Sequence, residues 1–291
     1  MLNVLKNIIF DGVLFLLRNF APSSVYLSFI FPRILGYRLD LQNPKTFNEK
    51  IQWIKLKDKN PLYTLCADKY KVRDFVKARI GSVYLIKLIA VYNSPNEISL
   101  AELPDKFALK LNTGSSCNLI CMNKSLLNED SVKKKFKKWM NNNSFYKRYK
   151  EFHYKNIEKK IICEELLENS NGQPLFDYKF YCFNGEPYII MVEMGEAFNM
   201  HRNIYNLDWT RHSGYITNEQ DSFDVNKPEK LDEMIDLARK LAKGFKEVRV
   251  DFYYVNKQIY FGELTFTSGA GFSKFSSYEF DLELGEMFDV K

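Results

Sequence analysis

The spacing of hydrophobic residues divides the chain into a helical first part, residues 1–80, and a strand-rich remainder. The first part opens with a strongly apolar stretch, residues 4–20, which predicts a helix interrupted only by single charged residues. A second helix start is predicted where Thr46 can cap the backbone and Glu49 follows three residues later, the pattern of a capping box. A further helix is expected over residues 62–80.

From residue 81 onward, short apolar runs rich in β-forming residues predict strands separated by turns. The expected strands cover residues 83–92, 107–111, 119–122, 160–167, 178–183, 187–193, 203–207, 248–254 and 259–265. Two helices interrupt them, a basic one over residues 131–141 and an amphipathic one over residues 230–243. The polar stretch of residues 142–156 is expected to be a mobile loop. Since there is no repeat and no long linker, the sequence predicts a mixed α+β fold.

The composition is that of an ordinary globular chain, with 46% hydrophobic and 27% charged residues over 291 positions, which is enough to bury a sizeable core. The net charge of +6 is compatible with an anionic ligand such as ATP or an acidic glycan, and it is too small to predict nucleic-acid binding. We interpret the basic run of residues 133–138 as a solvated helix face. The five cysteines include no CxxC pair, which favours a reducing compartment, the cytoplasm.

The apolar stretch of residues 4–20 leaves two interpretations open. Its uncharged runs are too short to span a bilayer, and no small-residue cleavage site follows it, as a secretory signal would require. A helix packed against the rest of the protein explains the pattern. A helix that lies on the inner face of the membrane explains it as well.

The most informative segments for chemistry are two successive strands near the carboxyl terminus. Strand alternation places Arg249 and Asp251 on one face of the first strand, and Glu263 and Thr265 on one face of the second. Across a hairpin these four side chains can converge. Two carboxylates and a hydroxyl suit Mg²⁺, and an arginine beside them can stabilise charge on a transferred phosphoryl group. An exposed, charged hairpin face would give the same pattern.

Three weaker features point towards a nucleotide. The loop of residues 114–116 lies between two predicted strands, and its backbone N–H groups could close over phosphates, although it is not a P-loop. Lys110 stands in an otherwise apolar strand, either as a solvated strand end or as a phosphate ligand. Residues 164–167 end another apolar strand and could contact a nucleotide base, but an ordinary strand exit looks the same.

In this order, these segments resemble the ATP-grasp superfamily, and most closely its TupA-like branch, which occurs among bacterial surface-polysaccharide genes. The resemblance extends from about Asn43 to Phe272. It is carried by Pro44–Trp53 (PKTFNEKIQW), Ala67–Tyr70 (ADKY), Phe107–Lys110 (FALK), Asp177–Phe180 (DYKF) and Phe261–Phe266 (FGELTF). It implies an ATP-grasp fold in which two α+β subdomains, residues 81–165 and 166–291, clasp ATP, preceded by the helical region of residues 1–80.

The resemblance also implies roles for individual residues. Lys69 and Lys110 match lysines on the nucleotide phosphates, and Asp177 falls where an acidic residue holds the ribose. The implied nucleotide contacts are Lys69, Lys110, Gly114, Ser115, Ser116, Glu164, Glu165, Leu166, Leu167, Asp177 and Lys179, with residues 164–167 forming the adenine hinge.

The metal and reaction site is implied in the same way. Asp251 and Glu263 match the carboxylates that bind two Mg²⁺ ions, and Arg249 matches the arginine on the acyl phosphate. Arg249, Lys110 and Arg202 form the implied catalytic set, and His201 and Arg202 are assigned to phosphate or to a substrate carboxylate. The chain departs from the family at Thr265, where many ATP-grasp enzymes have Asn. Either the Thr265 hydroxyl replaces this amide as the third metal ligand, or that ligand is missing.

The resemblance predicts an ADP-forming ligase that joins a carboxylate to an amine through an acyl phosphate. The implied partners are ATP and a small-molecule or glycan-linked carboxylate with an amine, such as an amino acid and a uronic acid or sugar of a capsule or lipopolysaccharide. An oligomer is compatible with the sequence. Two rivals remain: a glycosyltransferase that uses a sugar nucleotide, for which no Asp-x-Asp motif is found at a strand end, and a non-catalytic, membrane-attached assembly factor.

Overall fold

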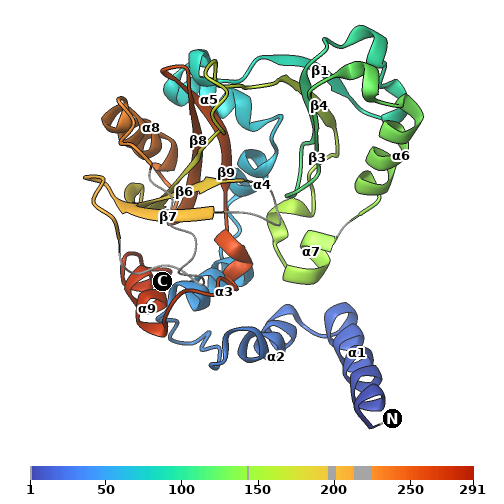
Figure 1. Cartoon of the computed structure of the whole chain (residues 1–291). Coiled ribbons are helices and arrows are strands. Elements are labelled where there is room, and N and C mark those ends of the chain that lie inside the picture. Colours follow the sequence, from blue (N-terminus) through green and yellow to red (C-terminus); the bar gives the residue numbers. More distant parts are fainter. Residues whose placement is uncertain (1, 143, 196–200, 213–224) are drawn as a thin grey trace.

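The computed structural model describes residues 2–142, 144–195, 201–212 and 225–291, and the side chains of residues 2–10, 144 and 145 lie outside this description. The chain forms two antiparallel sheets flanked and joined by helices (Figure 1). All pairings between the named strands are antiparallel. The mixed α+β class predicted from the sequence is therefore confirmed.

The first part of the described chain is helical. Its helices are α1 (Leu2–Phe20), α2 (Ser23–Leu35), α3 (Phe47–Lys57), α4 (Pro61–Ala67) and α5 (Val72–Ile80). At the start of α3, the Thr46 hydroxyl accepts a hydrogen bond from the Glu49 N–H and the Glu49 carboxylate accepts one from the Thr46 N–H, so the predicted capping box is present. None of the helices in the described residues has the length and apolar character needed to span a membrane.

The single helix predicted for residues 62–80 is wrong, because the structure interrupts it between α4 and α5. At the break, the Asp68 carboxylate accepts hydrogen bonds from the N–H groups of Tyr70 and Lys71. The N–H of Lys69 donates instead to the carbonyl oxygen of Asn112, in the loop after a distant strand. An Asp side chain that bonds the backbone locally competes with the helix in this way, and the break turns Lys69 towards the sheets.

The smaller sheet has the strand order β1-β4-β2-β3. Its strands are β1 (Leu88–Tyr92), β2 (Phe107–Leu111), β3 (Asn118–Cys121) and β4 (Ile161–Glu165). The first strand begins at Leu88 rather than at Val83, since a turn of 3-10 helix, η1 (Ser82–Tyr84), precedes it. The basic helix α6 (Glu129–Met140) packs against this sheet through Val132 and Phe136, which belong to the same core as Phe107. Its lysines stand on the remaining faces.

The segment predicted as a mobile loop, residues 142–156, is also corrected. It contains a short helix, α7 (Ser144–Tyr149), and a 3-10 turn, η5 (Phe152–Tyr154). Two of its polar residues, Glu151 and His153, are buried, at 6% and 0% exposure. The segment therefore has regular structure and contributes two buried polar side chains, although most of its other polar residues are exposed or half-buried.

The larger sheet has the strand order β7-β6-β5-β8-β9. Its strands are β5 (Asp177–Phe183), β6 (Glu186–Met194), β7 (His201–Asn206), β8 (Glu247–Val255) and β9 (Gln258–Thr265). The predicted turn between β5 and β6 is formed by Asn184 and Gly185, both with positive φ, as a tight hairpin requires. The amphipathic helix α8 (Leu231–Ala242) covers one face of this sheet with its buried leucines, so charged side chains can gather on the other face.

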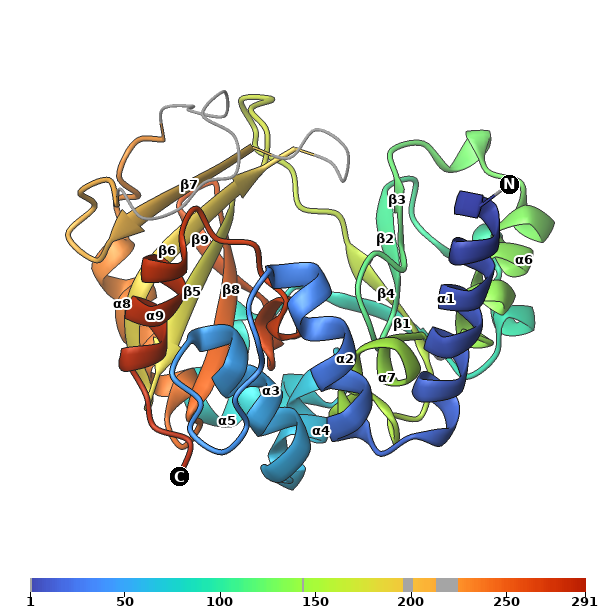
Figure 2. The same cartoon turned by 90° about the horizontal axis from the view of Figure 1, so that it is seen from below.

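The remaining elements connect and close the two sheets. They are the 3-10 turns η2 (Pro95–Glu97), η3 (Leu100–Glu102), η4 (Lys124–Leu126) and η6 (Ser268–Gly271), and the terminal helix α9 (Tyr278–Glu286). Figure 2 shows the five-stranded sheet with α8 and α9 at one side of the molecule and the four-stranded sheet with α6 at the other. The α3 helix packs against both α9 and η6, which ties the first part of the chain to the last.

Candidate active site

The β8–β9 hairpin brings together the four residues singled out from its sequence. Asp251 pairs with Glu263, and Arg249 pairs with Thr265, in the register of the two strands. The Arg249 guanidinium donates to both Asp251 oxygens, at 2.7 and 2.6 Å, in a bidentate pair. It also donates to Glu263 Oε1 at 3.3 Å and to the Thr265 hydroxyl at 3.1 Å, and this hydroxyl donates to Glu263 Oε1 at 2.9 Å. The four side chains therefore lie on one face, in mutual contact.

A β-bulge shapes this face. Asp251 pairs with Glu263 and Phe252 pairs with Phe261, so Gly262 is the extra residue in β9. A Cβ at Gly262 would lie 3.1 Å from the carbonyl oxygen of Asp251 and 3.2 Å from the ring of Tyr253. A side chain at this position would therefore press directly on the strand that carries Asp251.

The neighbouring strand β5 adds a lysine at the centre of three carboxylates. Lys179 pairs with Asp251 across the β5–β8 register. Its ammonium group lies 3.2 Å from Asp251 Oδ2 and 3.3 Å from Glu193 Oε2, and it also donates to Asp177 on its own strand. Lys179 is 7% exposed and Asp251 2% exposed, so these charges rely on one another rather than on water.

The series of charged contacts continues from Lys179 to β7, at the edge of the sheet. Glu193, on β6, pairs with Arg202, on β7, and their side chains form an ion pair with a 2.6 Å contact between Arg202 Nε and Glu193 Oε1. His201 lies beside Arg202 at the start of β7, opposite Met194. Both residues thus open a strand rather than lie in a loop, and Met200 falls outside the described residues. Among the contacts of the described residues, Arg202 is linked to Asp251 on the hairpin face through Glu193 and Lys179.

Lys69 links the hairpin to the smaller sheet. From the break between α4 and α5, its ammonium group reaches Glu263 Oε2 at 2.6 Å. The same group donates to the carbonyl oxygen of Gly114 at 3.3 Å, in the loop between β2 and β3. In that loop Gly114 and Ser116 have positive φ, of 78° and 58°, and Ser115 and Ser116 are exposed. The predicted phosphate loop and the predicted metal carboxylate therefore contact the same lysine.

A second charged group occupies the smaller sheet. Lys110 is in β2, an inner strand, so it is not at the edge of the sheet. Its ammonium group lies 2.8 Å from Glu164 Oε2, and the guanidinium of Arg73 lies 3.0 Å from Glu164 Oε1. Arg73 also donates to the carbonyl oxygen of Ile86 at 2.8 Å. Glu164 is therefore held between two cations from different parts of the fold.

The rest of the predicted hinge follows Glu164 along the chain. Glu165 ends β4, and its N–H donates to the carbonyl oxygen of Lys87 at 3.0 Å. The Glu165 side chain is exposed, and Leu166 and Leu167 are half-buried. These residues lie at the end of the strand next to β2, which carries Lys110.

The close packing of charged groups on the hairpin face determines their pKa values. Burial alone would raise the pKa of Glu263, but the cations of Lys69, Arg249 and Lys179 outweigh it and hold this pKa well below its usual range. Burial likewise opposes the charge on Lys179, and the carboxylates of Asp251, Asp177 and Glu193 outweigh it and raise the pKa of Lys179. Burial raises the pKa of Asp177 to about 7, partly offset by Lys179.

Two participants were not predicted from the sequence. Glu193 joins the cluster because β6 pairs with β5, and Arg73 reaches Glu164 from α5. A glutamate at the end of an otherwise apolar strand was the available signal for Glu193. Arg73 stands on a helix among other charged residues, and nothing in its neighbours marks it.

The donor set of the hairpin fits a hard divalent cation. Asp251, Glu263 and Thr265 offer carboxylate and hydroxyl oxygens on one face, which is the chemistry that Mg²⁺ prefers. Among the described residues there is no group of three His, Cys, Asp or Glu side chains arranged around a metal. Two carboxylates with a hydroxyl suit an ion that completes its shell with phosphate oxygens and water.

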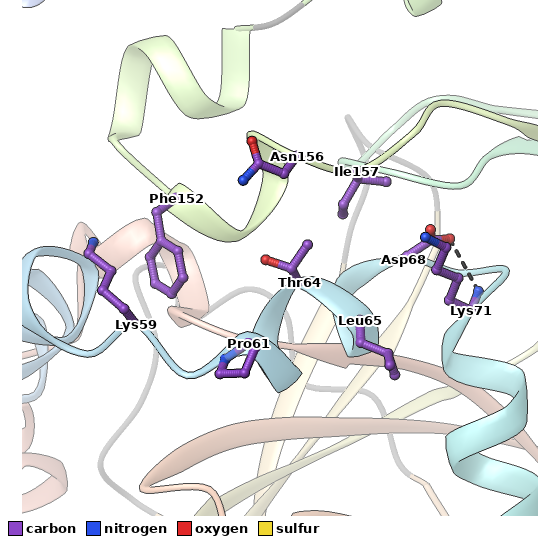
Figure 3. Close-up of a pocket in the computed structure, with 9 residues that line it drawn as sticks. All are labelled: Lys59, Pro61, Thr64, Leu65, Asp68, Lys71, Phe152, Asn156 and Ile157. Carbon is purple, nitrogen blue, oxygen red and sulfur yellow. Dashed lines mark hydrogen bonds between the residues drawn. The ribbon is translucent and has the colours of Figure 1, made fainter.

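A separate pocket of about 460 Å³ lies between α4 and the segment after η5 (Figure 3). Phe152 and Leu65 provide apolar walls, and Lys59 and Lys71 stand at its rim. Its lining includes Asp68 and none of the residues predicted for the site. The charged face of the hairpin is therefore distinct from this pocket.

Comparisons with known proteins identify the family of the chain. The model of a family described as TupA-like ATPgrasp matches residues 49–289. This match confirms the family resemblance found in the sequence and, with it, the ATP-grasp fold. No match was found among the curated proteins to which the sequence was compared.

Several solved structures also match. D-alanine–D-alanine ligase from Bacillus anthracis in complex with ATP does so at 10% identity and a TM-score of 0.41, over 70% of this chain and 54% of that one. L-amino acid ligase from Bacillus licheniformis does so at 11% identity and a TM-score of 0.46, over 77% and 48%. The ATP-grasp ligase PsnB, complexed with a minimal precursor, does so at 12% identity and a TM-score of 0.40, over 71% and 53%. The chain thus spans about half the length of these proteins.

Proposed function

The chain belongs to the TupA-like ATP-grasp family, and on this premise we propose that it is an ADP-forming ligase that joins a carboxylate to an amine through an acyl phosphate. One observation carries the proposal: Arg249, Asp251 and Glu263 share a face of the hairpin, and Lys69 joins that face to the loop at Gly114. A charged hairpin face with no function would not need a lysine that connects it to the other sheet.

We place the nucleotide between the two sheets. Lys69, Lys110 and the loop of residues 114–116 would hold its phosphates, and residues 164–167 would contact its adenine. Asp177 and Lys179 complete the proposed nucleotide set, with Asp177 towards the ribose. The same proposal divides the chain into the helical region of residues 1–80 and the subdomains of residues 81–165 and 166–291.

Asp251 and Glu263, with the hydroxyl of Thr265, would hold two Mg²⁺ ions. When bound, these ions neutralise phosphate charge and align the triphosphate. Arg249 and Lys179 form ion pairs with Asp251, and Lys69 forms one with Glu263. These cations stabilise two adjacent carboxylates that would otherwise repel each other.

The proposed reaction has two steps. A substrate carboxylate oxygen attacks the γ-phosphorus of ATP, the bond to the β-phosphate oxygen breaks, and ADP leaves with that electron pair. The amine nitrogen then attacks the acyl carbon, phosphate leaves with its oxygen, and the nitrogen loses a proton to give the amide. Lys110 and Arg249 hold the transferred phosphoryl group, so catalysis rests on alignment and on charge stabilisation.

For the substrates we propose an amino acid joined to a uronic acid or sugar in the synthesis of a bacterial surface polysaccharide, such as a capsule or lipopolysaccharide. His201 and Arg202 would bind phosphate or the substrate carboxylate. This part is supported by the resemblance to the polysaccharide-associated branch. We propose that the protein acts in the cytoplasm and contacts the inner face of the membrane peripherally through residues 4–20.

The decisive experiment uses a substrate carboxylate labelled with ¹⁸O. Purified protein is first incubated with ATP, Mg²⁺ and a panel of amino acids and uronates, and ADP release identifies the active pair. We expect one ¹⁸O atom per turnover in the released phosphate, because the carboxylate oxygen stays with phosphorus when the amide forms. Turnover without label in phosphate would rule out the acyl phosphate. The absence of ATP turnover across the panel would contradict the ligase activity.

The family match favours this activity over the sugar-nucleotide glycosyltransferase. A thermal-shift comparison provides a direct check. We expect ATP with Mg²⁺ to raise the melting temperature, and UDP-sugars to leave it unchanged. The opposite pattern would favour the glycosyltransferase.

A further inference from the structure

The α1 helix presents an exposed hydrophobic face. Val13, Leu16 and Phe20 follow the i, i+3, i+7 spacing that places side chains on one side of a helix. Their exposures are 39%, 57% and 75%, and these side chains come within three turns of one helix. Exposed apolar side chains that gather on one face of a helix make that face a candidate contact surface. The side chains of residues 2–10 lie outside the description, so the face is defined by these three residues.

The position of α1 is fixed by packing on its other side. Leu14 and Leu17 pack against a small core formed by α2. The ammonium group of Lys150, just after α7, donates to the carbonyl oxygen of Arg18 at 2.7 Å. Figure 1 shows α1 projecting from the body of the molecule, in contact with its neighbour α2. The apolar face is therefore presented outward by a docked helix.

The surroundings of this face are basic. Residues 11–39 contain three arginines and one acidic residue, Asp11, and residues 144–150 contain three lysines and arginines and no acidic residue. The two segments meet in space, because α7 packs against α1 and the hydroxyl of Tyr26 donates to the carbonyl oxygen of Arg148 at 3.0 Å. Burial and the nearby charge of Arg18 lower the pKa of Lys150, so an anion at this surface would relieve repulsion.

These features select one kind of partner. A helix with an apolar face and basic neighbours binds at the lipid interface, with its apolar side chains at the acyl boundary and its cations at the headgroups. A second copy of the chain would bring the same basic segments against each other. A spanning arrangement does not fit, since no helix in the described residues is long and apolar enough.

We propose that α1, α2 and α7 together form a docking surface for an anionic lipid bilayer, with Val13, Leu16 and Phe20 inserted at the interface and the basic residues of α1, α2 and α7 facing the lipid phosphates. This inference rests on the membrane contact included in the proposed function and extends it from one helix to a composite surface with a defined lipid charge. It does not depend on the ligase chemistry, because vesicle binding is measured without turnover.

The test is co-sedimentation of the full chain with vesicles. One set contains phosphatidylcholine alone, and the other contains equal parts of phosphatidylcholine and phosphatidylglycerol. We expect binding to the anionic vesicles that weakens as salt rises, and little binding to the neutral ones. The double variant Leu16→Glu/Phe20→Glu should lose at least about tenfold in affinity, since two charges replace the inserted side chains.

The matched control is Leu126→Glu, an 82% exposed leucine in η4 that lies outside the surface. It should bind like the unaltered chain. Circular dichroism and ATP-induced thermal shifts check that both variants are folded, which the exposure of the altered residues favours. Equal binding of the unaltered chain and the double variant, or no binding to anionic vesicles, would overturn the proposal. A dimer that the double variant dissociates in light scattering would identify a second copy as the occupant instead.

Discussion

Two groups of titratable residues lie near the carboxyl-terminal end of β9, and they differ in how far their side chains are exposed. One lies on the face of the β8–β9 hairpin, and the other lies beneath the turn that follows β9. On the hairpin face, Glu263 and Lys69 keep 32% and 23% of their side-chain surface exposed. Beneath the turn, Lys55, Glu151 and His153 are 1%, 6% and 0% exposed. The hairpin face is therefore accessible at Lys69 and Glu263, and the group beneath the turn is sealed throughout.

The group beneath the turn contacts a strained stretch of backbone that follows β9. Thr267 and Ala270 have positive φ, of 55° and 54°, which is uncommon outside glycine. The Lys55 ammonium donates to the carbonyl oxygens of Ala270 and Tyr149, at 2.7 and 2.8 Å, and the Thr267 hydroxyl donates to Glu151 at 2.8 Å. Burial lowers the pKa of Lys55 and raises that of Glu151, in each case partly offset by the other residue's charge.

The difference in exposure distinguishes residues that we expect to act on a ligand from residues that we expect to stabilise the fold. On the hairpin face, the partly exposed Lys69 can exchange a carboxylate for a phosphate or a substrate. Lys55 and Glu151 beneath the turn have no such access, so they support the shape of the turn. We therefore expect changes on the hairpin face to alter activity, and changes beneath the turn to alter stability first.

The largest expected effect is on activity, at Glu263. Replacing it as Glu263→Gln keeps the shape of the side chain and removes one charge of the proposed metal site. We expect the turnover of ATP with its identified substrate pair to fall by about a thousandfold or more, because the aligned phosphoryl transfer depends on this charge. The depressed pKa of Glu263 means that its charge also stabilises the fold, so urea unfolding of the variant is measured alongside to separate a loss of stability from the loss of turnover.

The matched control is Glu229→Gln, which removes a charge from an ion pair with Lys257 at the protein surface, where 67% of the glutamate side chain is exposed. Its activity should be unchanged. Near-normal activity of Glu263→Gln would remove this residue from the metal site, and equal losses in both variants would point to a general effect of charge.

The next effect is on stability, beneath the turn. Lys55→Met and Glu151→Gln should each cost about 3–5 kcal/mol of unfolding free energy, because each leaves a buried charge without its partner. The double variant removes both charges and should cost clearly less than the sum of the two single variants. Urea unfolding of the four proteins at one pH measures this coupling. Additive costs would mean that the two charges act independently, and the contrast between the two groups would then lose its support.

A smaller effect concerns pH and Glu247, which is 2% exposed and lies under the same turn. The Ser268 hydroxyl donates to Glu247 Oε1 at 2.7 Å, and Oε2 has no hydrogen-bond partner among the described residues. Burial raises the pKa of Glu247 from 4.5 to about 7. Between these values the native protein keeps a proton that the unfolded chain loses, so the unfolding free energy falls as pH rises from about 4.5 to about 7.

Glu247→Gln removes this titration. Between about pH 4.5 and about pH 7, we expect the unfolding free energy of the variant to fall by about 2–3 kcal/mol less than that of the unaltered chain. Urea unfolding at a series of pH values measures this difference. Asp177 and Glu151 have raised pKa values as well and give slopes of the same sign, whereas burial lowers the pKa of His153 to about 3 and gives a slope of the opposite sign. The difference between the two proteins therefore isolates Glu247. Parallel profiles for the two proteins would contradict a protonated Glu247.

The same two groups show what the sequence can and cannot predict. The pairing of Arg249, Asp251, Glu263 and Thr265 followed from strand alternation across a short turn, because both rules act over a few residues. The contact of Lys69 with Glu263 joins residues 194 positions apart, and the contact of Thr267 with Glu151 joins residues 116 apart. No local pattern specifies such contacts.

The errors have the same origin. The helix predicted for residues 62–80 breaks at Asp68 because Asn112, in a distant loop, bonds to both Asp68 and Lys69. The loop predicted for residues 142–156 was inferred from polar residues, yet the fold buries Glu151 and His153 among distant partners. Helix propensity and polarity describe a segment in water, and tertiary contacts overrode both here.

The smallest expected effect tests the residue that departs from the family, Thr265. Its hydroxyl donates to Glu263 and accepts from Arg249, so it is placed where a third metal ligand would be needed. Thr265→Ala removes the oxygen and should raise the Mg²⁺ concentration for half-maximal activity by about tenfold, a cost of about 1.4 kcal/mol. Thr265→Asn supplies an amide oxygen of similar reach and should restore the Mg²⁺ dependence of the unaltered chain. If Thr265→Ala leaves the Mg²⁺ dependence unchanged while Glu263→Gln abolishes turnover, the ions are held by the two carboxylates alone and the hydroxyl serves only to orient Glu263.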